Sequence, residues 1–399
     1  MSSIRIPLVL ASLLLTLAAG AADAAPRAIR RAPSSASAPR APALRPSTLD
    51  DELEQAAQRL LRSAKPVEGA VVMVEPKSGR VLAFSALSGA ANRFELLTKS
   101  RLPAASLFKI VTATALFEST TLSPRDEVCI QGGMRGIERR HLEPARGPGT
   151  ECGRFAWALG HSKNAVFAQL ATRLLTRDDL LRTAERLGFN SHLALDDGQR
   201  QVELGRLTVP YSDLAFARTA AGFQGSSLSP IGAAYLMTVI ARGGSPVGLR
   251  LHDSVAETEP SPPTPNPSPL FSARTAQRLT RMLEVTVETG TSRGAFTSPE
   301  GKRYLPGIRV AGKTGTLSPG QGQESTTSWF VGFAPSRSPE VVVSVMLVNG
   351  RLYRRKANEV ARDLLRTYFR SHGRAHAVTD PFEDAPGAGV AALAASPAR

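Results

Sequence analysis

The sequence predicts an α/β fold of the α+β type. We expect an antiparallel sheet built from both chain ends, flanked by helices, with an inserted and mainly helical lobe. Runs with β-strand character stand near the start of the folded region, at 69–75 and 80–85, and near its end, at 309–316, 328–334 and 340–348. Most segments between these runs have helical spacing. Because strands and helices do not alternate singly, a Rossmann-like sheet is disfavoured.

The first residues have the pattern of an export signal, which we assign to residues 1–24. Arg5 precedes an almost unbroken apolar run over 6–17, and small residues follow at 22–24. The run is short for a transmembrane helix, although an uncleaved anchor stays open. We therefore expect an exported protein in the periplasm or on the outer face of the cell envelope, membrane-anchored if the signal is retained.

The rest of the chain divides by composition into three parts. Residues 25–48 are rich in Ala, Pro, Ser and Arg and should form a disordered linker. The Ala-, Pro- and Gly-rich residues 376–399 should form a disordered tail. Residues 49–375 remain as one folded domain, which is long enough for a large core or for two lobes around a cleft.

The first elements of this domain are a helix and a hairpin. Apolar residues recur with helical spacing over 50–62, and Ser47 or Thr48 is a plausible cap. The first two β-rich runs are joined by Pro-Lys-Ser-Gly at 76–79, a turn-like stretch that predicts a hairpin.

Helices dominate the middle of the domain. Ser106 begins a helical pattern through residue 117, so it should lie where free backbone N–H groups favour negative charge. Residues 153–187 are mostly helical and are interrupted at 162–164, and a further helix is expected over 231–242.

The last part combines loops with the closing strands. The Pro-rich run 259–269 is expected to form an exposed loop, followed by a helix over 273–288. A Gly/Gln/Ser/Thr loop at 317–327 separates two closing strands and should border a cleft. A final helix is expected over 358–369.

The chain is strongly basic, with a formal net charge of +15 and a pI near 10.6. This charge favours anionic envelope polymers or membrane surfaces as neighbours. Nucleic acid is a poor alternative, because export separates the protein from it and no nucleic-acid motif is visible. The basic cluster Arg351, Arg354, Arg355 and Lys356 is interpreted as a solvated surface.

Two cysteines are present, Cys129 and Cys152. After export into an oxidising compartment, one disulfide between them is expected, worth roughly 3 kcal/mol in the chain-entropy model. Two buried free thiols are the alternative. Two cysteines without partnered histidines are too few for a structural zinc site, so we expect no metal and no cofactor.

Three short motifs occur in one order: Ser-Leu-Phe-Lys at 106–109, Ser-Lys-Asn at 162–164 and Lys-Thr-Gly-Thr at 313–316. Each alone has an ordinary explanation, as a helix cap, as turn residues or as a surface strand. However, Lys109 is the only lysine with a serine three residues before it, and Lys-Thr-Gly occurs once. Their joint occurrence in order indicates one shared site.

This motif set resembles the active site of penicillin-binding proteins and serine β-lactamases. The resemblance extends over roughly 65–370 and includes the opening hairpin, "AAGFQGSSLSPIGAA" at 220–234 and "SWFVGFAP" at 328–335. It implies a penicillin-binding protein transpeptidase fold in a nearly bare catalytic domain. One departure is Ala104-Ala105, where the family often has Pro-Gly.

The resemblance, together with the chemistry of acyl transfer, assigns roles in the first two motifs. A serine hydroxyl needs a base, so Ser106 would be the nucleophile and Lys109 the general base. Lys109 must be neutral at the moment of attack, and both burial and the charge of Lys313 would lower its pKa. Ser162 would relay a proton toward the leaving amine, and Asn164 would bind the peptide amide of the substrate.

The third motif would bind the substrate. By resemblance, Lys313 and Thr314 would hold the terminal carboxylate of a D-Ala-D-Ala stem, and Gly315 would let the strand approach it closely. The backbone N–H groups of Ser106 and Thr316 would form the oxyanion hole.

The resulting hypothesis is a peptidoglycan D,D-transpeptidase or D,D-carboxypeptidase that acts on stem peptides through a Ser106 acyl-enzyme. β-Lactams would acylate Ser106 as inhibitors, and a cell-wall synthesis protein is a possible partner. A serine β-lactamase is the alternative within enzymes, but no Glu-x-x-Leu-Asn segment follows Asn164 to supply a deacylation base. A non-catalytic cell-wall scaffold or β-lactam sensor is the alternative of another class; the three intact motifs argue against it.

Overall fold

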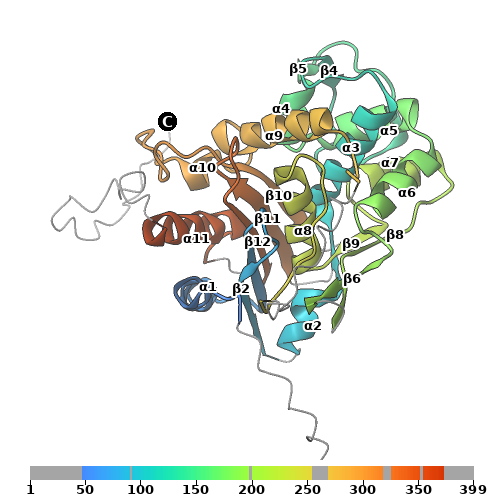
Figure 1. The fold of residues 1–399 in the computed structure, drawn as a ribbon. Coiled ribbons are helices and arrows are strands. Elements are labelled where there is room, and N and C mark those ends of the chain that lie inside the picture. The colour runs from blue at the N-terminus through green and yellow to red at the C-terminus, as the bar shows by residue number, and fades with distance from the viewer. Residues whose placement is uncertain are drawn as a thin grey trace, which may run out of the picture. The chain divides into compact units, whose positions relative to one another are not determined.

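One antiparallel sheet joins the two ends of the folded region (Figure 1). Strands β1 (Glu68–Val74) and β2 (Val81–Ser88) come from the start of that region. Strands β10 (Ala311–Leu317), β11 (Thr326–Ala334) and β12 (Val341–Asn349) come from its end. The order is β10–β11–β12–β1–β2, which places β10 at an edge. This arrangement confirms the predicted sheet.

The computed structural model describes residues 47–89, 92–196, 200–253, 268–317, 325–350 and 354–372. The expected export signal, the disordered tail and all but the last two residues of the expected linker lie outside the described residues. So do most of the Pro-rich run at 259–269 and of the loop at 317–327. No helix in the described ranges is both long and apolar enough to span a membrane.

Helices cover both faces of the sheet because its central strands are apolar on both sides. Alternate residues of β1 point to opposite faces: Val71 packs in a core with helices α1 (Asp51–Ala64) and α11 (Ala357–Ser371). Val72 packs in a second core that includes α8 (Pro230–Ala241). Every residue of β12 is buried, as expected for a central strand covered on both sides.

A mainly helical lobe is inserted between β2 and β10, as predicted (Figure 1). Its helices are α3 (Phe108–Ser119), α4 (Phe155–Gly160), α5 (Asn164–Leu174), α6 (Arg177–Arg186) and α7 (Asp213–Ala220). Helix α9 (Ala273–Glu288) packs against both α4 and β10 and so connects the lobe to the sheet.

Shorter elements complete the described fold. They are α2 (Arg93–Thr98), α10 (Arg293–Phe296), β3 (Leu102–Pro103), β4 (Glu127–Ile130), β5 (Glu151–Arg154), β6 (His192–Leu195), β7 (Arg200–Glu203), β8 (Gly205–Leu207) and β9 (Ser226–Leu228).

The start of the domain differs from the prediction in two respects. The N-cap of α1 is Asp50, whose Oδ1 accepts from the Leu53 N–H at 2.9 Å, and not Ser47 or Thr48. Thr48 is buried, and its hydroxyl donates to Val81 O at 2.8 Å. The last two residues of the expected linker therefore belong to the fold, because the Thr48 N–H also donates to Leu251 O at 2.8 Å and Ser47 forms a β-bridge with His252.

Candidate active site

Ser106 and Lys109 lie at the start of α3, where Ser106 lines a cleft and Lys109 lies beneath it. Ser106 is in a 3₁₀ turn (Ala105–Leu107) that precedes the α-helix, whereas the sequence predicted a helix from Ser106 itself. Lys109 is one turn further on, with Nζ 2.7 Å from Ser106 Oγ. Its Nζ also donates to Ala221 O at 2.8 Å. The lysine amine is therefore in place to exchange a proton with the serine.

Lys109 is fully buried, and its surroundings disfavour its charged form. The Phe167 ring centroid lies 5.9 Å from Nζ. Burial, and to a smaller extent the charge of Lys313, hold the pKa of Lys109 well below its usual range. Both predicted causes of a lowered pKa are confirmed. A neutral amine at 2.7 Å can accept the proton of Ser106.

The turn that presents Ser106 depends on a close contact with the end of α7. Ala105 has a φ of +50°, a left-handed conformation that is uncommon for a residue with a side chain. Gly222 follows Ala221 with a φ of +84°, and a Cβ at Gly222 would lie 2.1 Å from Ala105 O. Glycine at 222 lets the backbone approach the turn and place the Ala221 carbonyl on Lys109.

The second motif connects α4 to α5 and brings Ser162 to Ser106. Ser162 Oγ lies 2.9 Å from Ser106 Oγ, and its backbone is left-handed with a φ of +57°. Lys163 points elsewhere: its Nζ pairs with Glu151 at 2.7 Å and lies 4.7 Å from the Trp157 ring centroid. Within this motif, Ser162 therefore faces Ser106, whereas Lys163 is held against the lobe by Glu151 and Trp157.

Asn164 begins α5 and lines the cleft. Its Nδ2 donates to Gly133 O at 3.3 Å and to Met134 O at 2.8 Å. These bonds fix the amide plane, so that its other polar atom, Oδ1, is oriented by the loop around residue 133.

The third motif lies on the edge strand β10. Lys313 is fully buried, its Nζ donates to Thr314 O at 2.8 Å, and burial lowers its pKa to about 7. Thr314 and Thr316 line the cleft. Because β10 is an edge strand, its free edge has the backbone groups that an extended peptide can pair with.

Gly315 has a packing role in the structure. A Cβ there would lie 3.3 Å from Leu107 Cγ and 3.4 Å from Ala104 O, which is tighter than usual. The missing side chain lets β10 lie against the turn that carries Ser106. Its predicted role, close approach of the strand to substrate, stays a prediction.

A short segment after α9 links the second and third motifs. The Thr291 N–H donates to Gly160 O at 3.1 Å, two residues before Ser162. The Thr291 hydroxyl lies 2.6 Å from that of Thr314. A Cβ at Gly290 would lie 2.2 Å from Gly160 O, so glycine is needed for this close approach. The positions of the two motifs are thus coupled through Thr291.

The three motifs meet in one cleft of about 360 Å³. Its lining residues, mostly hydroxyl- or amide-bearing, are Ser106, Met134, His161, Ser162, Asn164, Thr291, Thr314, Thr316, Ser328, Trp329, Lys356, Ala357 and Asn358. Lys109 and Lys313 lie below this surface, and Gly315 is not part of the lining. Another cavity of about 400 Å³, between α8 and α9, contains none of the motif residues.

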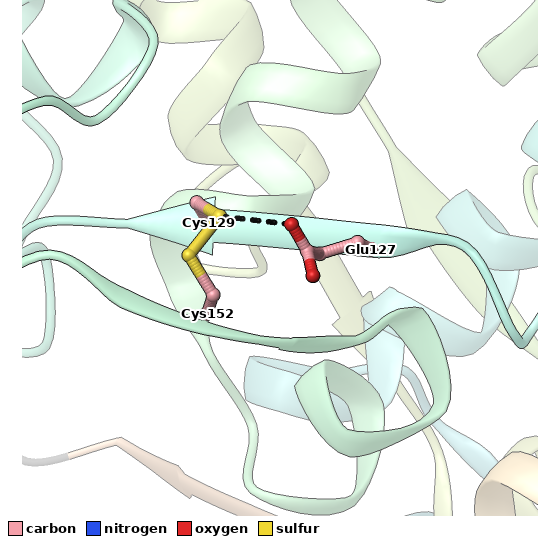
Figure 2. Close-up of side chains that lie close together, drawn as sticks. All are labelled: Glu127, Cys129 and Cys152. Atoms are coloured by element: carbon pink, nitrogen blue, oxygen red, sulfur yellow. Dashed lines mark hydrogen bonds between the residues drawn. A yellow bond between two sulfur atoms is a disulfide. The ribbon is translucent and has the colours of Figure 1, made fainter.

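Cys129 and Cys152 form a disulfide between the paired strands β4 and β5 (Figure 2). Glu127 lies beside them, with its carboxylate 3.9 Å from Cys129 Sγ. This group of three has the composition of a metal site, but sulfur atoms bonded to each other offer no thiolate ligands. The disulfide closes the loop whose Gly133 and Met134 carbonyls hold Asn164.

Several cleft residues were missed by sequence reasoning. The Ala221 carbonyl and Thr291 act through a backbone group and a single hydroxyl, which no motif signals. The basic cluster was interpreted as a solvated surface, and Arg354 and Lys356 are indeed exposed. Lys356 in addition lines the cleft, whereas Arg355 is partly buried and pairs with Asp363. Arg351 lies outside the described residues. The position of Lys356 just before the last helix was the available signal.

Comparison with known proteins gives consistent matches. A family model described as the penicillin binding protein transpeptidase domain matches residues 69–366. The chain is 25% identical over 350 residues to the peptidoglycan D,D-transpeptidase PbpA of Mycobacterium tuberculosis, covering 76% of this chain and 67% of that protein. It is 24% identical over 329 residues to the stage V sporulation protein D of Bacillus subtilis, covering 76% of this chain and 49% of that one.

Solved structures match over most of the chain. The D,D-transpeptidase domain of a peptidoglycan glycosyltransferase from Eggerthella lenta superposes with a TM-score of 0.64 at 25% identity, covering 82% of each chain. Penicillin-binding protein A of M. tuberculosis, as a ceftriaxone acyl-enzyme complex, gives 0.60 at 22% identity, covering 80% of this chain and 79% of that one. At 22% identity, the likeness to penicillin-binding protein A is evidence for the fold and not for the activity.

Proposed function

The chain belongs to the family of penicillin-binding protein transpeptidase domains, and from that premise we propose that it is a peptidoglycan D,D-transpeptidase whose acyl-enzyme forms on Ser106. One observation carries the assignment: Ser106 Oγ has Lys109 Nζ at 2.7 Å and Ser162 Oγ at 2.9 Å. A serine with a buried amine on one side and a second hydroxyl on the other is equipped for covalent catalysis.

The first step is acylation. Neutral Lys109 accepts the Ser106 proton while Oγ attacks the carbonyl carbon of the penultimate D-Ala of a stem peptide. The carbonyl oxygen becomes negatively charged and is bound by the backbone N–H groups of Ser106 and Thr316. Each such donor is worth about 3 kcal/mol of transition-state stabilisation in comparable sites. The packing of Gly315 on Leu107 supports this arrangement, because it holds β10 beside the nucleophile turn.

The intermediate then collapses. The C–N bond of the scissile peptide breaks, and the leaving D-Ala amine takes the proton that Lys109 accepted, relayed through the Ser162 hydroxyl. An ester between Ser106 and the donor peptide remains. Deacylation by the amine of a second stem peptide forms the cross-link, whereas attack by water is the carboxypeptidase outcome.

The remaining motif residues orient the substrate. The fixed amide of Asn164 binds the donor peptide, and the free edge of β10 pairs with its backbone. Thr314 and Thr316 contact its terminal carboxylate. A peptidoglycan substrate implies a protein that acts outside the cytoplasm, in agreement with the export signal expected from the sequence. A cell-wall synthesis protein is its proposed partner.

Penicillins are expected to acylate the same serine, since they imitate the D-Ala-D-Ala end. The test is fluorescent-penicillin labelling of the purified chain beside Ser106→Ala, followed over hours. Label that needs Ser106 and is lost slowly supports the proposal. Rapid Ser106-dependent turnover would instead assign a β-lactamase, and a folded wild-type protein that takes no label would contradict the acyl-enzyme.

Transfer is then measured directly. A D-Ala-D-Ala peptide is offered with and without an amine acceptor, and the released D-Ala and the cross-linked product are quantified. Cross-linked product that needs Ser106 supports the transpeptidase. Free D-Ala without any product in the presence of acceptor assigns a D,D-carboxypeptidase.

A further inference from the structure

The terminal carboxylate of the proposed substrate needs a positive charge that it can reach. Lys313 is poorly placed to contact it directly. Its side chain is fully buried, lies outside the cleft lining, and directs Nζ to Thr314 O at 2.8 Å. Burial also lowers its pKa to about 7, so a large fraction of Lys313 is neutral at neutral pH.

Lys356 is a cation on the cleft surface itself. Its side chain is exposed and lines the cleft together with Thr314, Thr316 and Ser328. Among the described lining residues none carries a carboxylate, and most offer hydroxyl or amide donors. Such a surface favours an anionic ligand.

The start of α11 adds to this preference. Lys356 is its N-cap, so the first free backbone N–H groups of a 15-residue helix lie at this end of the cleft. The nearby Glu359 carboxylate accepts from the Lys356 N–H at 2.8 Å, which turns it toward the backbone. Arg354 is exposed beside it, and the adjacent Arg355 is paired with Asp363.

The start of α11 is fixed relative to the third motif. Asn358 Nδ2 donates to Ser292 Oγ at 3.2 Å, and the neighbouring Thr291 hydroxyl meets Thr314. Asn358 lines the cleft with 7% exposure, and its Oδ1 has no hydrogen-bond partner in the described part of the chain. Because Oδ1 only accepts hydrogen bonds, its completion requires a donor such as water, and Asn358 Oδ1 does not itself contact a carboxylate.

We propose that Lys356, at the N-terminus of α11, is a specificity-determining residue that binds the free terminal carboxylate of the substrate in the cleft that it lines with Thr314 and Thr316. The inference rests on the proposed function and deepens it. It means that a substrate whose terminal carboxylate is replaced by a neutral amide loses this contact.

The probes are two thioesters of N-benzoyl-D-alanine, one with a mercaptoacetate leaving group and one with the matching mercaptoacetamide. Release of thiol by the full chain gives the second-order rate constant of acylation. Lys356→Ala should lower it about tenfold for the carboxylate probe, as the loss of a contact worth ~1.4 kcal/mol does. The constant for the amide probe should change less than twofold.

Two further variants sharpen the test. Lys356→Arg keeps the charge and should retain most of the rate, whereas Lys302→Ala removes an exposed lysine that is not part of the cleft and should act like wild type. Rising ionic strength should slow the carboxylate probe in wild type more than in Lys356→Ala.

The possible failures are distinct. Equal losses on both probes, or no loss on either, would overturn the role of Lys356 while leaving the acyl-enzyme intact. Wild-type protein that releases no thiol through Ser106 would overturn the proposed function, and the carboxylate contact with it.

Discussion

Two buried lysines, Lys109 and Lys313, lie below the cleft, and the charge of one affects the protonation of the other. Lys313 lowers the pKa of Lys109 in addition to the effect of burial. In the proposed mechanism Lys109 is the general base and must be neutral, so acylation should accelerate as pH rises through its pKa. Because the pKa of Lys313 is lowered to about 7, this repulsion is strongest below neutral pH and fades above it.

Lys313→Met removes the charge and keeps much of the volume. Without a positive neighbour the pKa of Lys109 rises, so the acidic limb of the pH–rate profile should move to higher pH. The measurement is the rate of acylation by benzylpenicillin between pH 5 and pH 9, corrected for the hydrolysis of benzylpenicillin without enzyme at each pH. The exposed Lys302→Met serves as control and should keep the wild-type midpoint. A midpoint that stays in place or moves to lower pH in Lys313→Met would contradict the coupling.

At the scale of elements, the turn that carries Ser106 is held by its neighbours more than by its own sequence. Ala105 is left-handed, and the Ala221–Gly222 backbone, Leu107 and Gly315 close around it. Left-handed backbone costs roughly 1–2 kcal/mol for a residue with a side chain. The surrounding packing compensates for that cost, so the contact at Gly222 should be sensitive to substitution.

Gly222→Ala and Gly243→Ala form a matched pair. Both glycines have positive φ, +84° and +70°, but a Cβ at 222 would lie 2.1 Å from Ala105 O whereas nothing lies within 4 Å at 243. Gly243→Ala should cost about 1 kcal/mol from backbone strain alone. Gly222→Ala should cost about 3 kcal/mol or more and slow acylation at least tenfold, because the turn and the Ala221 carbonyl must move. Urea unfolding and penicillin acylation measure both effects, and equal costs at the two sites would refute the close contact.

Sequence reasoning worked best for long, strongly patterned elements. It predicted a helix over 273–288, and α9 has those bounds. It did not predict β3, which has two residues and pairs with β9 more than a hundred positions away. Such a strand exists because of a distant partner, and local periodicity carries no information about it.

The candidate site likewise combines residues that the sequence predicted with residues that it did not. Motif spacing located Ser106, Ser162 and Lys313, and the structure brings their segments together. The Ala221 carbonyl could not be predicted, because any residue type supplies a backbone oxygen. Lys356 was assigned to a solvated surface and is exposed, but it also lines the cleft. This second position depends on the packing of α11 on the sheet, which local sequence does not signal.

At the scale of the whole molecule, the cleft lies where the sheet meets the helical lobe, and each contributes one wall. The sheet wall rests on two packed cores, whereas the lobe wall includes the long loop between β4 and β5. Within this loop Gly133 and Met134 hold Asn164, and Met134 lines the cleft with 55% of its surface exposed. The Cys129–Cys152 disulfide closes the loop at its base.

Removing that disulfide should therefore affect the lobe wall more than the nucleophile. In the double variant Cys129→Ser/Cys152→Ser, the free energy of unfolding should fall by roughly 3 kcal/mol, as the chain-entropy model gives for a loop of this length. Acylation should slow only a fewfold, because Asn164 loses its fixed support while the Ser106–Lys109 pair stays packed on α3 and Ala221. Urea unfolding and penicillin acylation are the measurements, with exposed Glu127→Gln as the control. An unchanged stability would contradict the stabilising role of the loop closure, and abolished acylation would mean that the loop supports the nucleophile itself.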